Sequence, residues 1–106
     1  MNKKIKIIDP IGESGFTIYK FAAGDDLSSV ADRFHTSAHV IVAANNLTEY
    51  PVVGEYLLIE KTDGEKRVVM PKDTFESLCG YDEKKIAEVK RKNRAEYLYV
   101  GQRIFV

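Results

Sequence analysis

The sequence predicts an α+β fold made of two βααβ units in succession, each with two helices packed on a two-stranded antiparallel sheet. The first supporting observation is an internal duplication, because three residues recur in the same order 47 or 48 positions later: Asp25 and Asp73, Asn45 and Asn93, Gly54 and Gly101. The second is a change of hydrophobic period within each copy, from strand-like alternation to helical spacing and back. The two strands of a unit flank its helices, and we therefore expect them to pair with each other.

The first unit, residues 16–60, begins with the alternating, β-rich segment "FTIYKF", which predicts a strand. Apolar residues at helical spacing follow and predict a helix: Leu27, Val30, Ala31 and Phe34. Helix caps are expected at the polar residues before each apolar run: Asp25 or Asp26 for the first helix, Thr36 or Ser37 for the second. The segment "YLLIE" predicts the closing strand.

The second unit, residues 67–106, repeats this order with different side chains. Asp73 and Glu76 have the spacing of a capping box, which predicts the start of its first helix. Asp82 is expected to cap the second helix, "EKKIAEVKRKN", and "RIFV" predicts the closing strand. Cys79 falls on the apolar face of the first helix.

The remaining segments are short. Residues 61–66, "KTDGEK", are polar with a central Asp-Gly and predict a linker between the units. Residues 1–15 form an N-terminal segment that is expected either to add a strand or to be loose. The formal net charge is zero, from sixteen basic and sixteen acidic side chains, so no overall field favours nucleic acid as a partner.

The ordered segments resemble the LysM family. The first copy reads "YKFAAGDDLSSVA", "AANNLT" and "VVGEYLLIE", and the second reads "RVVMPKDTFESLC", "KRKNRAE" and "YVGQRIFV". The family pattern has Gly-Asp-Thr-Leu before the first helix, an Asn at the end of the second and Val-Gly before the last strand. The resemblance therefore implies a tandem pair of LysM-like repeats. The second is divergent, since Lys72 stands where the family has Gly.

The resemblance implies a non-catalytic module that binds a glycan containing N-acetylglucosamine, such as peptidoglycan or chitin, mainly through the first repeat. The family's groove lies between the loop that enters the first helix and the loop that leaves the second. In the first repeat these loops contain the expected site residues: Gly24, Asp25, Asp26, Leu27, Asn45, Asn46, Leu47 and Thr48. A second candidate site in the other repeat comprises Asp73, Thr74, Phe75, Asn93 and Arg94.

Structural roles compete with ligand binding at several of these positions. Asp25 and Asp73 are suited to capping a helix, and Asn45 and Asn93 are suited to ending one, because Asn tolerates a left-handed backbone. Tyrosines next to the closing strands either pack or stack on sugar rings: Tyr50, Tyr56, Tyr97 and Tyr99. Both interpretations stay open at this point.

No set of catalytic residues is present, so we expect no enzyme activity, cofactor or metal. The residues His35 and His39 are four apart, but the expected cap between them places them on different sides of a helix start. No apolar stretch approaches the length of a membrane span. The apolar run near the start is too short for a signal peptide, which predicts a cytoplasmic location by default.

A second function is compatible with the same pattern. A LysM-fold module that no longer binds sugar could serve protein–protein assembly or localisation, for example in a spore coat or a phage-derived particle. The missing signal peptide and the split of charge favour this alternative, since residues 1–60 carry five basic and eight acidic side chains and residues 61–106 carry eleven and eight. Cell wall, spore or phage particle could then be reached by another route. The sequence leaves the oligomeric state open.

Overall fold

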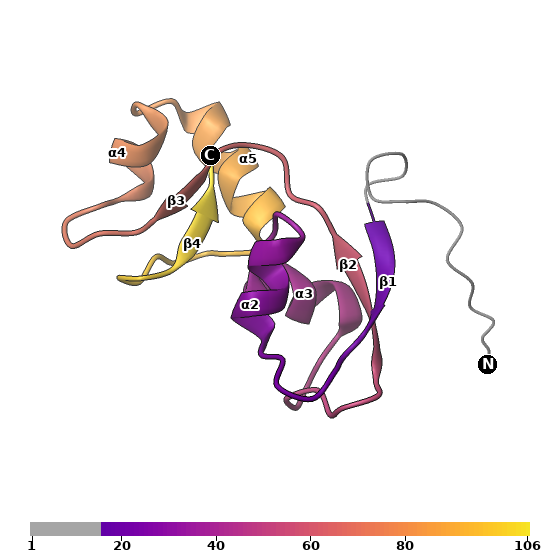
Figure 1. The fold of residues 1–106 in the computed structure, drawn as a ribbon. Helices are drawn as coiled ribbons and strands as arrows, with labels where there is room; N and C mark the ends of the chain where they lie inside the picture. The colour runs from indigo at the N-terminus through magenta and orange to yellow at the C-terminus, as the bar shows by residue number, and fades with distance from the viewer. Residues whose placement is uncertain (1–15) are drawn as a thin grey trace. The chain divides into compact units, whose positions relative to one another are not determined.

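The computed structural model describes residues 16–106, and the predicted N-terminal segment 1–15 lies outside the described residues. The chain divides into two compact units between Lys61 and Thr62 (Figure 1). Each unit has the order strand, helix, helix, strand, and its two strands form an antiparallel sheet. The predicted α+β fold with two βααβ units is therefore confirmed.

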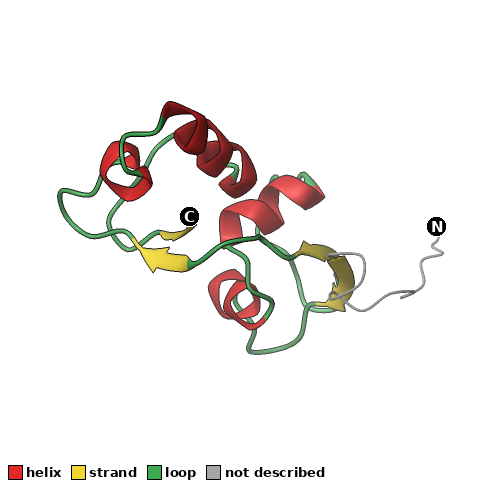
Figure 2. Cartoon of the chain, turned by 90° about the horizontal axis from the view of Figure 1, so that it is seen from above, coloured by secondary structure: helices red, strands yellow, loops and turns green. Residues whose placement is uncertain are grey.

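The first unit contains β1 (Phe16–Lys20), α2 (Leu27–Arg33), α3 (Ala38–Asn45) and β2 (Tyr56–Glu60). The two strands pair antiparallel with Ile18 opposite Leu58. Both helices lie on one side of this sheet (Figure 2).

The core of the first unit includes three of the four apolar positions predicted for its first helix, and the fourth, Phe34, is partly buried against it. Its buried cluster joins both helices and the sheet: Phe21, Leu27, Val30, Ala31, Ile41, Leu57 and Ile59. Val30, Ile41 and Ile59 are fully buried. Each such aliphatic side chain contributes about 1.5–3 kcal/mol when it is removed from water, so the cluster is the main source of stability in this unit.

Short polar side chains start both helices of the first unit. Of the two expected caps for α2, Asp26 is the one used, since its Oδ1 accepts a hydrogen bond from Ser29 N at 2.8 Å. Ser37 caps α3 by accepting from Val40 N at 3.3 Å. Asp25 is therefore left for another role, described below.

The second unit contains β3 (Lys66–Val68), α4 (Phe75–Cys79), α5 (Glu83–Asn93) and β4 (Arg103–Phe105). The helix α5 has the predicted bounds, and Asp82 caps it through hydrogen bonds from Lys84 N and Lys85 N. Strand β3 includes Lys66, the last residue of the predicted linker. The buried cluster of this unit contains Val69, Phe75, Cys79, Val89, Ala95 and Ile104.

The predicted capping box of Asp73 and Glu76 is wrong. The box is formed one residue later, by Thr74 and Ser77, whose side chains each accept from the other's backbone N–H at 2.9 and 3.0 Å. Asp73 lies one residue before the cap position of α4, and its carboxylate accepts from Met70 N at 2.7 Å.

Four tight turns close the ends of the sheets with one shared design: Ala22–Asp25, Val52–Glu55, Met70–Asp73 and Tyr99–Gln102. In each turn the fourth residue's N–H donates to the first residue's carbonyl at 3.0 or 3.1 Å. The fourth side chain also accepts from the first residue's N–H, at 2.7 to 3.1 Å. The third residue has positive φ, which is typical of a type II turn and favours glycine. These third residues are Gly24 (88°), Gly54 (97°), Lys72 (78°) and Gly101 (90°).

Candidate functional site

In the first unit, one tyrosine connects the loop before α2 to the loop after α3. The backbone N–H of Leu27, the first residue of α2, donates to the hydroxyl of Tyr50 at 2.9 Å. The Tyr50 ring packs edge-on against Phe21, with ring centroids 6.1 Å apart and an interplanar angle of 77°. The two loops that the sequence predicted to face each other are thus joined through Tyr50.

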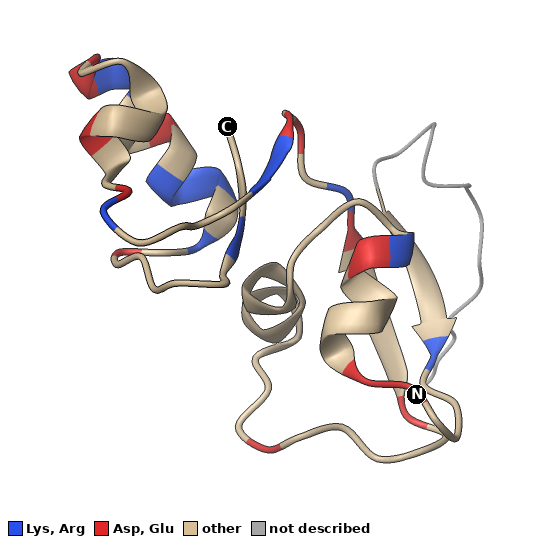
Figure 3. Ribbon diagram, turned by 60° about the vertical axis from the view of Figure 1, so that its left-hand side comes forward, with Lys and Arg blue, Asp and Glu red and all other residues tan. Residues whose placement is uncertain are grey.

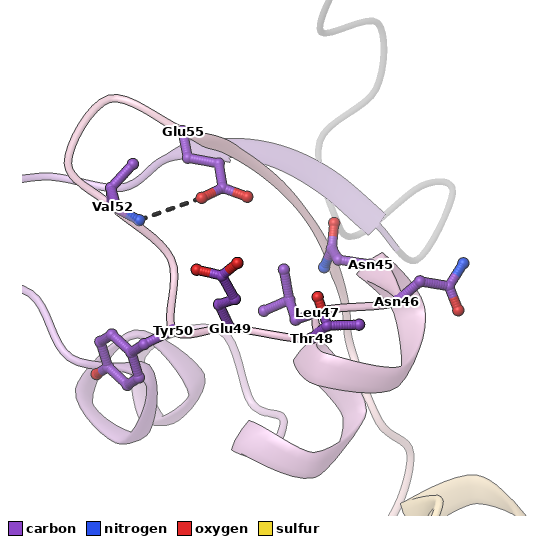
Figure 4. Close-up of a pocket in the computed structure, with 8 residues that line it drawn as sticks. All are labelled: Asn45, Asn46, Leu47, Thr48, Glu49, Tyr50, Val52 and Glu55. Atoms are coloured by element: carbon purple, nitrogen blue, oxygen red, sulfur yellow. Dashed lines mark hydrogen bonds between the residues drawn. The ribbon is translucent and has the colours of Figure 1, made fainter.

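A hollow of about 410 Å³ lies along the loop after α3 (Figure 4). It is lined by four residues of the predicted site, Asn45, Asn46, Leu47 and Thr48, and by four others, Glu49, Tyr50, Val52 and Glu55. The four predicted residues of the other loop, 24–27, do not line it. The sequence pattern missed Glu49, Val52 and Glu55, because nothing in their spacing marks them as neighbours.

Asn45 has a structural role that the sequence did not reveal. Its amide nitrogen donates to the carbonyls of Ile41 and Leu58, both at 2.8 Å, and its Oδ1 accepts from Leu58 N at 2.7 Å. The side chain therefore fastens the end of α3 to β2. The expectation that Asn45 takes a left-handed backbone is wrong, since it is the last helical residue and Asn46 is the left-handed one, with φ 51°.

Asp25 is held by a network on the strand side of its loop. Tyr19 hydroxyl donates to Asp25 Oδ2 at 2.6 Å, Ala22 N donates to the same atom at 2.8 Å, and Arg33 Nη2 lies 3.2 Å from Oδ1. The Arg33 guanidinium also lies over the Tyr19 ring, 5.1 Å from its centroid. The hydrogen bonds from Tyr19 and Ala22 lower the pKa of the Asp25 carboxyl below its ordinary value, and Arg33 adds to this effect.

The backbone of the same loop keeps one donor available. Gly24 is exposed, and within residues 16–106 its N–H makes no hydrogen bond. A β-carbon at this position would meet no atom within 4 Å. A ligand can therefore approach the Gly24 backbone closely.

Most of the corresponding residues of the second unit have structural roles. Asn93 repeats the Asn45 arrangement, donating to the carbonyls of Val89 (2.7 Å) and Phe105 (2.8 Å) and accepting from Phe105 N (2.8 Å). Phe75 is buried in the core. The other predicted residues lie at the helix boundaries: Asp73 in its turn, Thr74 as the cap of α4 and Arg94, with φ 54°, after α5.

The tyrosine bridge has no counterpart in this unit. Tyr97 precedes the glycine of the closing turn by four residues, as Tyr50 does, but it is 85% exposed. Within the part of the chain that the structure describes, Tyr97 makes no hydrogen bond. The loops of the second unit are therefore not joined in this way.

Three other features of residues 16–106 bear on function: possible metal ligands, helix length and the cysteine. No three His, Cys, Asp or Glu side chains of this range are grouped so that they could hold a metal ion. Among the same residues, no helix has the length and apolar character to cross a bilayer. Cys79 is buried, and burial raises the pKa of its thiol.

Comparisons with known proteins find similar solved structures and a family model that matches part of the chain. The chain is 25% identical to the Bacillus cereus spore cortex-lytic enzyme SleL over 87% of this chain and 22% of that one, with a TM-score of 0.42. The same enzyme from Bacillus megaterium QM B1551 is 26% identical over 84% and 22%, with a TM-score of 0.41. The chain thus spans about a fifth of the length of both.

A search of curated proteins gives no match. The family model of the LysM domain matches residues 19–59, which run from within β1 to within β2 and include all eight residues that line the hollow.

Proposed function

We propose that the first unit is a non-catalytic module that binds a glycan containing N-acetylglucosamine, of the peptidoglycan or chitin type. One observation carries this proposal: the hollow along the loop after α3 lies wholly within the segment that matches the LysM domain, which is a glycan-binding family. Its volume of about 410 Å³ is in the range of ligand pockets, which are about 300–1,000 Å³.

The lining of the hollow suits an acetamido sugar. An acetamido group has an N–H donor, a carbonyl acceptor and a methyl group. The side-chain amide of Asn46 and the hydroxyl of Thr48 make no hydrogen bond to the described residues, so both can bond to a ligand. Leu47 and Val52 supply apolar surface for the methyl group and the sugar ring.

The loops are ordered before any ligand arrives. The bond from Leu27 N to Tyr50, the Asn45 bonds to β2 and the closing turn at Val52–Glu55 each fix part of the site. A fixed site loses less entropy on binding, which raises its affinity. Asn45 therefore belongs to the site as its support, and Asn46, Leu47 and Thr48 are the contacting residues of this proposal.

The test is an NMR titration of the full chain with N-acetylglucosamine oligomers, and with cello-oligosaccharides of the same length, which lack the acetamido group. We expect amide shifts at Gly24–Leu27 and Asn45–Tyr50 with the first ligand series alone. Tyr50→Ala should weaken binding about fivefold, equivalent to the loss of one hydrogen bond of about 1 kcal/mol, and Tyr97→Ala is the matched control. No shifts at millimolar ligand, or equal shifts with both series, would contradict the proposal.

The second unit is proposed to be a diverged copy that keeps the fold without an equivalent site. Its support is the repetition of the hydrogen bonds of Asp25, Asn45 and Glu55 by Asp73, Asn93 and Gln102. The predicted second site at Asp73, Thr74, Phe75, Asn93 and Arg94 then serves the fold. Calorimetry should give one bound oligomer per chain, and a stoichiometry of two would contradict this assignment.

A second function, protein assembly or localisation in a wall, spore or phage particle, rests on the surface of the second unit. Six apolar side chains there are at least half exposed: Val68, Met70, Tyr81, Tyr97, Tyr99 and Val100. Such a group is a candidate protein-binding surface. A pull-down should compare purified peptidoglycan with host lysate, using Tyr97→Ser/Val100→Ser as the variant. Lysate proteins that are captured by the wild type and lost by the variant, together with no retention on peptidoglycan, would favour this function.

A further inference from the structure

The hollow of the first unit is acidic. Two of its eight lining side chains, Glu49 and Glu55, are carboxylates, and none is a cation. The described cations of this unit do not line it: Arg33 pairs with Asp25, Lys20 lies over the Tyr56 ring, and Lys61 follows β2. Acidic positions lie in the loops of the first unit (Figure 3). Lys20, the last residue of β1, lies at the same end, opposite Tyr56 in the sheet.

No cation of residues 16–106 pairs with either carboxylate. Glu49 makes no hydrogen bond or ion pair with residues 16–106. Glu55 accepts from Val52 N at 3.1 Å through Oε1, which is a bond to a neutral donor. In Figure 4 the two carboxylates extend into the same space, Glu49 from the loop after α3 and Glu55 from the turn before β2.

The charge of Glu55 is not needed for its turn. In the second unit the same turn is closed by Gln102, whose neutral Oε1 accepts from Tyr99 N at 2.9 Å. The backbone bond of this turn is 3.1 Å long in both units. A neutral amide can therefore accept the same hydrogen bond as Glu55, and the negative charge at position 55 is available for a ligand.

The geometry points to a glucosamine residue with a free amino group, bound with its ammonium between Glu49 and Glu55. This inference rests on the proposed function and specifies its substrate class as a partly de-N-acetylated glycan. An ammonium has three donors and no acceptor, which matches two carboxylates that form no ion pair within the described range 16–106. Sugars with carboxylate or phosphate groups are disfavoured in the same space by like-charge repulsion.

The expected preference is moderate because the hollow is open to solvent. Each exposed ion pair changes a binding constant by up to about fivefold. Two carboxylates should therefore give roughly fivefold to tenfold tighter binding of the amine-bearing sugar. Salt should reduce this preference, since exposed charges are screened.

The experiment measures dissociation constants of the full chain for two tetrasaccharides, one fully N-acetylated and one in which a single acetyl group has been removed to leave a free amino group, by calorimetry. The variants are Glu49→Gln, Glu55→Gln and both together, with Glu96→Gln of the second unit as the control. We expect the wild type and Glu96→Gln to prefer the amine-bearing oligomer about fivefold or more, and the double variant to bind both oligomers equally. An amide spectrum of Glu55→Gln should show the turn intact, as Gln102 implies.

Three results would overturn the inference, and they have different meanings. If the wild type binds the acetylated oligomer equally or more tightly, the inference fails while the proposed function stands. If the double variant keeps the preference, the ammonium binds elsewhere. If neither oligomer binds, the proposed function fails and the inference fails with it.

Discussion

Lys72 occupies a backbone conformation that disfavours it, so Lys72→Gly should stabilise the second unit. Its φ is 78°, in the third position of a turn where the three equivalent residues are glycines. A residue with a β-carbon loses roughly 1–2 kcal/mol in the left-handed region. Glycine avoids this strain, but its backbone loses more conformational entropy on folding, which costs about 0.5–1 kcal/mol. The net gain for Lys72→Gly is therefore about 0.5–1 kcal/mol.

No compensating contact is lost in this change. Lys72 is exposed and makes no hydrogen bond or ion pair with residues 16–106. Pro71, directly before it, suits the second position of the turn, so the turn itself is kept.

Amide hydrogen exchange is the appropriate assay, because it reports on each unit separately. A gain of about 0.5–1 kcal/mol slows exchange of the Val89 and Ile104 amides roughly twofold to fivefold and leaves Val30 and Ile41 unchanged. The matched control is Gly24→Ala, whose β-carbon would meet nothing within 4 Å and which therefore adds backbone strain alone. It should speed exchange in the first unit by a similar factor. Unchanged or faster exchange in the second unit of Lys72→Gly would refute the strain argument.

Three further predictions concern stability and reactivity. Asn93→Ala should destabilise the second unit by about 2–4 kcal/mol in urea unfolding, because it leaves buried backbone groups unpaired. Asn45→Ala should cost less, since Asn45 and its partner Leu58 are half-buried. The hydrogen bond from Tyr19 is the main cause that lowers the folded-state pKa of Asp25 below 3.8. The ionised Asp25 therefore stabilises the fold fully above pH 3.8, and this contribution is lost as the pH falls through the folded-state pKa. In circular-dichroism melts over this pH range, the melting temperature of Tyr19→Phe should fall less than that of the wild type. Cys79 should react with a thiol reagent at neutral pH only after unfolding, because it is buried with a raised pKa, and fast labelling of the folded chain would contradict this.

The local features of the fold could be predicted from the sequence. The periodicity located both units, and the isolated Asp82 before an amphipathic segment gave the bounds of α5. Where two capping residues are adjacent, as with Asp25 and Asp26, spacing alone cannot choose between them. The choice depends on the preceding turn, which uses Asp25 for its own N–H and leaves Asp26 to the helix.

The site was predicted less completely because its bonds join residues that are distant in the sequence. Tyr50 and Leu27 are 23 residues apart, and Asn45 and Leu58 are 13 apart. Such pairs have no local signal, so a pattern of residue types can name the loops but not the contacts between them. Glu55 is the clearest case, since its role is visible only when its turn is compared with that of Gln102.

The asparagine at the end of each second helix has a consequence for how chains meet one another. A two-stranded sheet has open edges, and an unpaired edge can recruit a strand from a neighbouring molecule. In each unit the side-chain amide occupies the N–H and carbonyl of a residue on the closing strand, Leu58 or Phe105, and so takes the place that a foreign strand would fill. Loss of either asparagine would therefore do more than loosen a helix, because it would uncover an aggregation-prone edge.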